Sequence, residues 1–219
     1  MIDFHAHILP GIDDGAKNSK ESVKLLRALA SQGVTKVLAT PHFYPGERSV
    51  EEFLEDRQNS IERLIKALSN KEDADELPKI AVGAEVLFYP SVAGMEGLSE
   101  LCISGTEYML LEMPFEKWMP RVFDGVYRII ANCGITPIIA HIDRYIVYGN
   151  DISAAYQLKE MGAVVQVNAE FFTSFKTKRK AVSYFRHSAA DVLGSDSHNM
   201  EKRAPEIGKA VEYAQKKAG

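Results

Sequence analysis

Short apolar runs alternate along the chain with longer segments in which apolar residues recur at helical spacing. The runs are rich in β-branched residues and predict strands over residues 2–6, 34–40, 79–84, 107–112, 135–141, 163–168 and 191–195. Several of them, such as 135–140, are apolar almost throughout, as expected for strands that are covered on both faces. This alternation predicts an α/β fold built on a mostly parallel sheet or barrel.

The predicted helices carry recognisable start and stop signals. Asn18 precedes Glu21 by three residues, and Ser49 precedes Glu52 by the same spacing, which predicts an N-cap and a capping box at each place. Gly33 stands where the first of these helices is expected to end.

Composition narrows the class of protein. The chain has 219 residues, of which 46% are hydrophobic and 26% are charged, as is ordinary for a soluble globular protein. No apolar run approaches the roughly 18 residues that a membrane span needs, so we expect no membrane insertion. No linker composition or fixed-period repeat divides the sequence, and residues 1–219 are therefore predicted to form one domain.

Charge, the N-terminus and the cysteines exclude further classes. A formal net charge of -4 argues against a nucleic-acid groove, because affinity for phosphate backbones comes mainly from clustered Lys and Arg. The chain opens on Met1 without a signal-peptide pattern, which predicts a cytoplasmic location. Cys102 and Cys133 are too few and too far apart for a disulfide framework or a thiolate zinc site.

Most of the histidines and four acids fall at or just after the predicted strand ends. These residues are His5, His7, Asp14, His42, Glu85, Glu112, His141, Asp196 and His198. The C-terminal ends of barrel strands meet on one face, so residues far apart in the sequence can form one site there. Two pairs with i, i+2 spacing, 5/7 and 196/198, place both side chains on the same face of an extended segment. Imidazole mixed with carboxylate suits Mn²⁺, Fe²⁺ or Zn²⁺, and the pattern predicts a cluster of divalent metals.

Each residue taken alone has an ordinary structural explanation. A single histidine at a strand end is commonly a hydrogen-bonded structural residue, and Glu85 or Glu112 could be a buried acid paired with an arginine. Asp13 and Asp14 lie between glycines and could be turn formers. The convergence of the whole set on strand ends favours the metal site. His187, inside a predicted helical segment, is assigned no role.

Seven short motifs span the whole chain: Met1–Gly15, Thr40–His42, Gly83–Glu85, Leu111–Glu112, Ala140–Tyr145, Gln166–Asn168 and Ser195–Asn199. A lone His-x-His element is weak evidence, whereas an ordered series at these separations is specific. The series resembles the PHP (polymerase and histidinol phosphatase) superfamily, in particular its capsule-locus tyrosine phosphatases of the CpsB or YwqE type.

The resemblance implies a distorted (β/α)7 TIM-like barrel with a centre of three divalent ions. Mn²⁺ is the ion that it favours, with Fe²⁺, Zn²⁺, Co²⁺ or Mg²⁺ as alternatives. By motif match, the first ion would be held by His5, His7, Glu85 and Asp196, the second by Glu85, Glu112 and His141, and the third by Asp14, His42 and His198. Asp143 departs locally from the family pattern, which carries Glu there as readily.

The resemblance also implies that Arg144 and Arg203 face the phosphate. Divalent ions activate water and stabilise phosphoryl charge, and two arginines can add paired hydrogen bonds to the phosphoryl oxygens. A salt bridge to a neighbouring acid is the alternative role of Arg144, and a solvated helix start is that of Arg203. Neither Cys102 nor Cys133 is followed by an arginine six positions later, which excludes cysteine-dependent phosphatase chemistry.

The substrate implied by the resemblance is the phosphotyrosine-bearing tail of a bacterial tyrosine kinase that controls capsule or exopolysaccharide synthesis. A histidinol-phosphate or other small-molecule phosphatase and a PHP nuclease are the alternative enzymes. A degenerate metal-binding regulatory module is the alternative outside enzymes. A flexible tail needs an open mouth, for which the aromatic candidates near strand ends are Phe43, Tyr44, Phe115, Trp118, Tyr145, Phe171 and Phe172.

Overall fold

The computed structural model describes residues 1–69 and 71–218. Its strands are β1 (Ile2–Ala6), β2 (Lys36–Ala39), β3 (His42–Phe43), β4 (Lys79–Val82), β5 (Glu85–Leu87), β6 (Tyr108–Glu112), β7 (Thr136–Ile139), β8 (Val164–Asn168) and β9 (Val192–Gly194). Its α-helices are α1 (Ser19–Ser31), α2 (Val50–Leu68), α3 (Pro120–Cys133), α4 (Ile152–Glu160), α5 (Ala169–Thr173), α6 (Lys178–Arg186) and α7 (Ile207–Ala218). Short 3-10 helices are η1 (Ala74–Glu76), η2 (Val92–Gly94), η3 (Leu98–Leu101) and η4 (Ile142–Tyr148).

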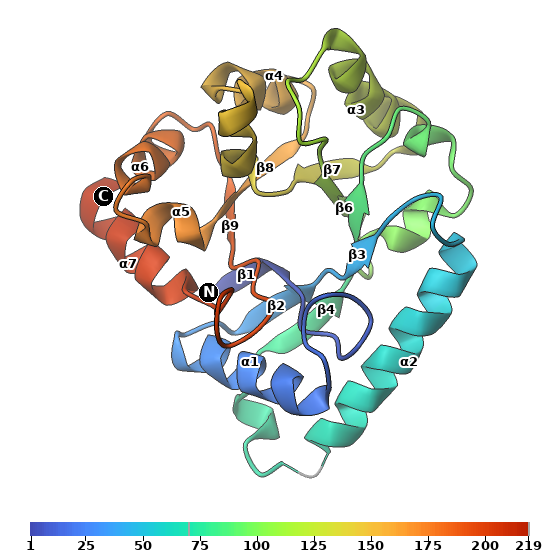
Figure 1. Ribbon diagram of the computed structural model, residues 1–219, viewed down its shortest axis with the longest axis vertical. Coiled ribbons are helices and arrows are strands. Elements are labelled where there is room, and N and C mark those ends of the chain that lie inside the picture. The colour runs from blue at the N-terminus through green and yellow to red at the C-terminus, as the bar shows by residue number, and fades with distance from the viewer. Residues whose placement is uncertain (70, 219) are drawn as a thin grey trace.

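The strands form a curled, parallel wall with the helices outside it (Figure 1). One part of the wall has the order β1-β2-β4 and the other the order β3-β5-β6-β7-β8-β9, and the pairs within both are parallel. Backbone hydrogen bonds from His7 N to Ser197 O (2.9 Å) and from Asp196 N to His5 O (2.8 Å) join β1 to the segment after β9. The α/β barrel-like fold expected from the sequence is confirmed.

Two predicted strands are shorter than expected, and each is followed by a short strand that was not predicted. The predicted strand 34–40 is observed as β2 and the predicted strand 79–84 as β4, while β3 and β5 lie just beyond the predicted ranges. Pro41 separates β2 from β3, and a residue without a backbone N–H cannot donate to a strand ladder. The two additional strands matter for the site because β3 and β5 pair with His42 directly opposite Glu85.

The predicted helix starts are found with one difference. Ser49 and Glu52 form the expected capping box at the start of α2. Asn18 caps α1 through its side chain, but the Glu21 carboxylate accepts from Lys17 N, so this start is an N-cap without the reciprocal half of the box.

The main hydrophobic core lies between the wall and the helices. Leu25 and Leu29 of α1, Val37 of β2, Leu111 of β6 and Val126 of α3 are fully buried members of it. Within the described residues, none of the helices has both the length and the apolar character that crossing a membrane requires. Packing of the helices on the outside of the wall leaves its C-terminal strand ends to carry polar side chains.

Candidate metal centre

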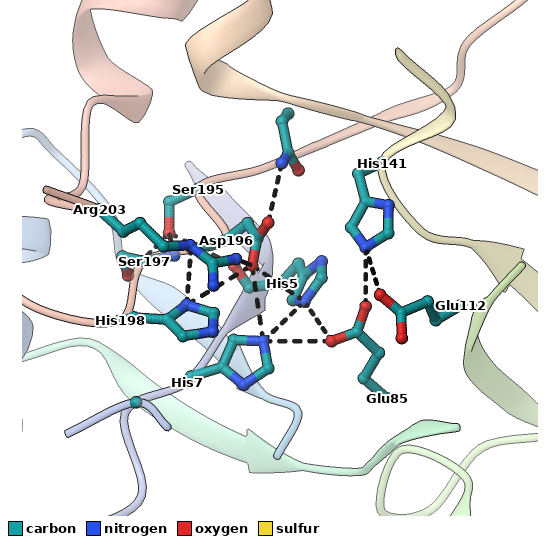
Figure 2. Close-up of polar contacts among 12 residues, drawn as sticks. His5, His7, Glu85, Glu112, His141, Ser195, Asp196, Ser197, His198 and Arg203 are labelled. Carbon is teal, nitrogen blue, oxygen red and sulfur yellow. Dashed lines mark hydrogen bonds and ion pairs between the residues drawn. The ribbon is translucent and has the colours of Figure 1, made fainter. Parts of the chain in front are cut away.

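The structure brings the nine predicted donor residues into one cluster, most of which Figure 2 shows. They come from the ends of β1, β6 and β7, from the first residues of β3 and β5, and from the loops after β1 and β9. His5, His7, His141, Asp196 and His198 are almost completely buried, whereas the Asp14 side chain is 65% exposed. The cluster is therefore a buried site with one acidic residue at its mouth.

Glu85 stands at the centre of the cluster. Its Oε2 atom lies 3.1 Å from His5 Nε2, 3.2 Å from His7 Nε2 and 3.1 Å from His42 Nδ1. Its Oε1 atom lies 2.9 Å from His141 Nε2. One carboxylate thus contacts four imidazoles with its two oxygens, which is the arrangement expected of a bridging ligand.

The remaining acids extend the cluster on both sides. Asp14 Oδ1 lies 3.2 Å from His198 Nε2 and 3.5 Å from His42 Nε2. On the other side, Glu112 Oε1 lies 3.4 Å from His141 Nε2.

Among the described residues, three groups have donor atoms within 4.8 Å of one another: His7 with Asp14, His42 and His198; His5 with His7 and Asp196; and His42 with Glu85 and Glu112. The first group contains the whole third ligand set implied by the resemblance, and the second contains three of the four residues of the first set. The third group differs from the second implied set because it contains His42 rather than His141.

The donor set suits divalent cations because several imidazole nitrogens face carboxylates or one another at the centre of the cluster. His5 Nε2 and His7 Nε2 face each other at 3.0 Å beside the Glu85 carboxylate. His42 Nδ1 and His198 Nε2 are buried near carboxylates without a hydrogen bond of acceptable geometry. Burying an unpaired polar atom costs about 1–3 kcal/mol, and a shared cation between such nitrogens and carboxylates removes that cost.

Residues behind the donors orient them, and sequence reasoning gave these no role of their own. Asp13 Oδ2 lies 2.7 Å from His7 Nδ1, so the opposite ring nitrogen of His7 faces the cluster. Gln166 Oε1 lies 3.3 Å from His5 Nδ1 and has the same effect on that ring. The sequence suggests for Asp13 no more than a turn-forming role within the Met1–Gly15 motif. Asn168 likewise donates to Asp196. The i, i+2 spacing of Gln166 and Asn168 at the end of a predicted strand is the sequence feature that could have indicated that both side chains face the site.

The pKa values within the cluster differ sharply from one histidine to the next. Burial lowers the pKa of His7, but hydrogen bonds to Asp13 and Glu85 outweigh it and raise this pKa to about 10. Hydrogen bonds to Glu112 and Glu85 outweigh burial at His141 and raise its pKa to about 9. Burial, together with the positive charges of His7 and Arg203, lowers the pKa of His198 to about 2.

The backbone is strained at two of the predicted donors. Among the described residues, the non-glycine residues with positive φ are His141 (29°), Asp196 (51°) and Ser188 (54°). Such conformations are unfavourable for residues with a Cβ atom and persist where the surrounding structure imposes them. Gly194 packs so closely on the site that an added Cβ would lie 2.6 Å from His5 Cβ.

Arg144 and Arg203 both pair with Asp196. Arg144 Nη2 donates to Asp196 Oδ2, and Arg203 Nη2 donates to Asp196 Oδ1 at 2.6 Å. The two side chains remain about one-third exposed, at 31% and 32%, and line a cavity of about 220 Å³ with Asn168 and Ser195. Arg203 lies in the loop before α7, so it is not at a helix start. The salt bridge to a neighbouring acid, expected as the alternative role of Arg144, is therefore present with Asp196. The Arg144 side chain also lines the cavity.

The prediction that seven aromatic residues could line the mouth of the site is mostly wrong. Five of the seven candidates are buried in the core: Phe43, Trp118, Tyr145, Phe171 and Phe172. The two others do border the cluster. Tyr44 stacks on His42 with ring centroids 5.1 Å apart, and Phe115, which is 43% exposed, stacks on His141 with centroids 6.1 Å apart.

Comparison with known proteins finds relatives that are named tyrosine-protein phosphatases. The chain is 32% identical to the tyrosine-protein phosphatase CpsB of Streptococcus pneumoniae, over 100% of this chain and 91% of that protein. It is 30% identical to the tyrosine-protein phosphatase YwqE of Bacillus subtilis, over 100% of this chain and 85% of that protein.

Solved structures agree with the sequence relatives. A crystal structure from work on B. subtilis YwqE and S. pneumoniae CpsB, described as unique metal-dependent tyrosine phosphatases, superposes with a TM-score of 0.82 at 28% identity, covering 100% of this chain and 88% of that chain. Histidinol phosphate phosphatase of Lactococcus lactis, solved with zinc, L-histidinol and phosphate, has a TM-score of 0.56 at 13% identity, covering 100% of this chain and 93% of that chain, and shares the fold.

The family described as capsular polysaccharide synthesis, CpsB/CapC, matches residues 1–219. This match confirms the resemblance that the motifs carry, from the first His-x-His element to the final Asp-x-His. The chain belongs to the CpsB/CapC family.

Proposed function

We propose that this chain is a metal-dependent protein-tyrosine phosphatase that hydrolyses phosphotyrosine with water as the nucleophile. The observation that carries the proposal is the shared Asp196 carboxylate. It lies 3.5 Å from His5 Nε2 and His7 Nε2 and also accepts from Arg144 and Arg203, so it joins the donor cluster to the arginine-lined cavity. The relatives CpsB and YwqE are tyrosine-protein phosphatases, which supports the same reaction here.

The nine clustered donors would hold three divalent ions, for which we propose Mn²⁺. Bound ions of this kind supply an activated water and neutralise phosphoryl charge. Glu85 would serve two ions because its two oxygens face different imidazoles. Asp13 and Gln166 keep His7 and His5 turned toward the cluster. The completeness of this donor set argues against a degenerate regulatory module.

Arg144 and Arg203 would bind the phosphoryl group. A guanidinium has five N–H donors, and each of these arginines gives one terminal nitrogen to Asp196. Both side chains line the cavity of about 220 Å³, and the other terminal nitrogen of Arg203 lies 3.9 Å from Asp14 Oδ2. Charge-assisted hydrogen bonds from a planar fork suit the oxygens of a phosphoryl group, where negative charge is spread in the transition state.

Tyr44 and Phe115 would accommodate an aromatic leaving group. They stack on His42 and His141, which contact different oxygens of Glu85, so aromatic surface borders the cluster at two places. An aromatic ring prefers such surfaces to water, whereas a small aliphatic phosphate gains little from them. This feature favours a phosphate ester with an aromatic ring, such as phosphotyrosine, over a small aliphatic phosphate. Histidinol phosphate also carries an aromatic ring, so kinetics must separate it from phosphotyrosine.

The physiological substrate in this proposal is the phosphorylated tail of a cytoplasmic tyrosine kinase domain that regulates capsule synthesis. The family description, capsular polysaccharide synthesis, supports that process. The kinase would meet this protein in the cytoplasm.

Arg144→Ala tests whether the site is shaped for phosphate. Turnover of a phosphotyrosine peptide should fall on the order of 10²-fold, comparable to removing one oxyanion donor, while metal content stays unchanged. Arg144→Lys should recover part of the loss, because an ammonium keeps the charge without the planar fork. Arg128→Ala, an exposed arginine of α3, is the matched control.

Kinetics and metal content are measured on the same samples. A metal-depleted Arg144→Ala protein would show that the pair with Asp196 is structural, and a metal-replete, fully active one would remove Arg144 from the mechanism. Higher kcat/KM for histidinol phosphate than for the peptide would replace the proposed substrate class with the small-molecule alternative.

A further inference from the structure

A second cavity, of about 870 Å³, lies at α6 and α7, apart from the metal centre. Its lining includes Phe175, Lys178, Arg179, Arg186, Tyr213 and Lys217. Figure 1 shows α6 and α7 side by side on the outer side of the barrel, and the two helices are in contact. We refer to these six residues as the basic cleft.

The basic cleft carries a local charge opposite to that of the whole protein. Between Phe171 and Ala190 the sequence contains five Lys and Arg residues and no Asp or Glu, in a chain whose formal net charge is -4. In the described part of the chain, neither Lys178 nor Arg179 is within salt-bridge distance of a carboxylate. Unpaired cations around a concavity attract anions, because their fields add there.

Aromatic rings stand among these cations. Lys178 Nζ lies 4.9 Å from the ring centroid of Phe175 and 5.6 Å from that of Tyr213. The Phe175 side chain is 87% exposed, which is unusual for a phenylalanine next to a cavity. A ligand with both an aromatic ring and a negative charge would contact both kinds of side chain at once.

The basic cleft lies a short distance from the metal centre along the chain. Asn168, at the start of α5, donates to Asp196, and Phe175 follows two residues after the end of α5. One short helix and its links separate these residues by at most roughly 20 Å. An extended peptide crosses that distance with about six residues, at about 3.3 Å per residue.

We infer that the basic cleft binds a second phosphotyrosine of the same substrate chain while the first one occupies the metal centre. The inference rests on the proposed function and adds to it a preference for multiply phosphorylated substrates. The guanidinium of Arg179 and the ammonium of Lys178 meet the phosphate, and Phe175 and Tyr213 flank the ring. Binding at two points makes the second contact intramolecular and so raises affinity without any new chemistry at the metal centre.

Three synthetic peptides test the inference: one with a single phosphotyrosine, one with two phosphotyrosines seven residues apart, and one with two phosphotyrosines two residues apart. The widely spaced peptide should have a KM about tenfold below that of the single one, after the statistical factor of two is removed. The closely spaced peptide cannot reach both sites and should show no such gain.

Two matched double variants locate the effect. Lys178→Glu with Arg179→Glu should abolish the gain and leave kcat for the single peptide unchanged. Both changes fall at the start of α6, where acidic residues suit the helix dipole, so folding should be retained. Lys24→Glu with Lys66→Glu makes the same charge change on exposed positions of α1 and α2 and should keep the gain. Anisotropy of the labelled widely spaced peptide on chelator-treated protein gives a readout that does not depend on turnover.

The outcomes separate this inference from the proposed function. If the single peptide is hydrolysed but the widely spaced one gains nothing, the inference is wrong and the proposed function stands. If none of the peptides is hydrolysed, the proposed function fails first. If the cleft variant keeps the peptide gain and instead loses binding to phosphatidylserine vesicles, the cleft serves an anionic membrane and the inference is overturned.

Discussion

Glu85→Gln is the most direct test of the proposed metal centre, because this change keeps the shape of the side chain and removes its charge. Glu85 is 1% exposed, and its oxygens lie 2.9 to 3.2 Å from four imidazole nitrogens. Hydrogen bonds and charge from these histidines outweigh burial and hold the pKa of Glu85 well below its usual value. The carboxylate is therefore ionised, and the substitution removes one full buried negative charge.

The expected loss can be worked out from these contacts. Glu85 would hold two of the ions that activate water and stabilise phosphoryl charge. Turnover should therefore fall on the order of 10³-fold, equivalent to about 4 kcal/mol in the stabilisation of the transition state. Because Glu85 would serve two ions, the variant should lose about two of the three ions proposed for each chain. His187→Ala, at an exposed position just after α6, should change neither quantity.

Metal content, measured by mass spectrometry, and steady-state kinetics on the same preparations test whether Glu85 bridges two ions. Circular dichroism should show that Glu85→Gln remains folded, because the main core lies on the helix side of the wall. A folded variant with full metal content and near-normal turnover would refute the bridging role of Glu85.

The remaining predictions address the nucleophile, the protons and the packing of the site. A chelator should abolish hydrolysis of a phosphotyrosine peptide and Mn²⁺ should restore it best, whereas iodoacetamide should do little; strong inactivation that substrate prevents would contradict water as the nucleophile. Since the pKa values of His7 and His141 are raised to about 10 and about 9, metal binding near pH 7.5 should release protons, measured by calorimetry in two buffers. By linkage, these two groups stabilise the metal-free fold fully below about pH 6.5, the unfolded pKa of histidine, and that stabilisation is lost as pH rises through 9 to 10. Gly194→Ala should lower turnover and metal content, because its new Cβ would lie 2.6 Å from His5 Cβ; full metal content would contradict this packing argument.

The location of the site could be predicted from sequence because it depends on topology alone. Parallel strands place their C-terminal ends on one face, so each donor needed only to be assigned to a strand end. Errors of two or three residues in the strand boundaries did not change which side chains were expected to meet. The fold class followed in the same way from the alternation of apolar runs with helical segments.

The orientation of the aromatic side chains could not be predicted in this way. Phe43 follows His42 in β3, and successive side chains of a strand point to opposite faces, so Phe43 packs on Phe53 in the core while His42 faces the cluster. Phe171 and Phe172 lie in α5, where they pack on Tyr184 and Phe185. Nearness to a strand end therefore says little about which way a ring points.

The partners of long side chains also depend on tertiary contacts that the sequence does not display. The sequence allowed Arg144 to be either a phosphate ligand or a salt-bridge partner, and the structure shows why these roles are compatible. Asp196 has a positive φ of 51°. Its Oδ2 atom accepts from Asn168 and Arg144, whereas its Oδ1 atom accepts from Arg203 and also lies 3.5 Å from His5 Nε2 and His7 Nε2. A donor that belongs to both the cluster and the arginine pair links the two parts thermodynamically. A cation bound beside Asp196 would weaken the ion pairs between its carboxylate and the two guanidinium groups, and so raise the affinity of those groups for an anion. By linkage, the bound anion would raise the affinity for the cation by the same factor.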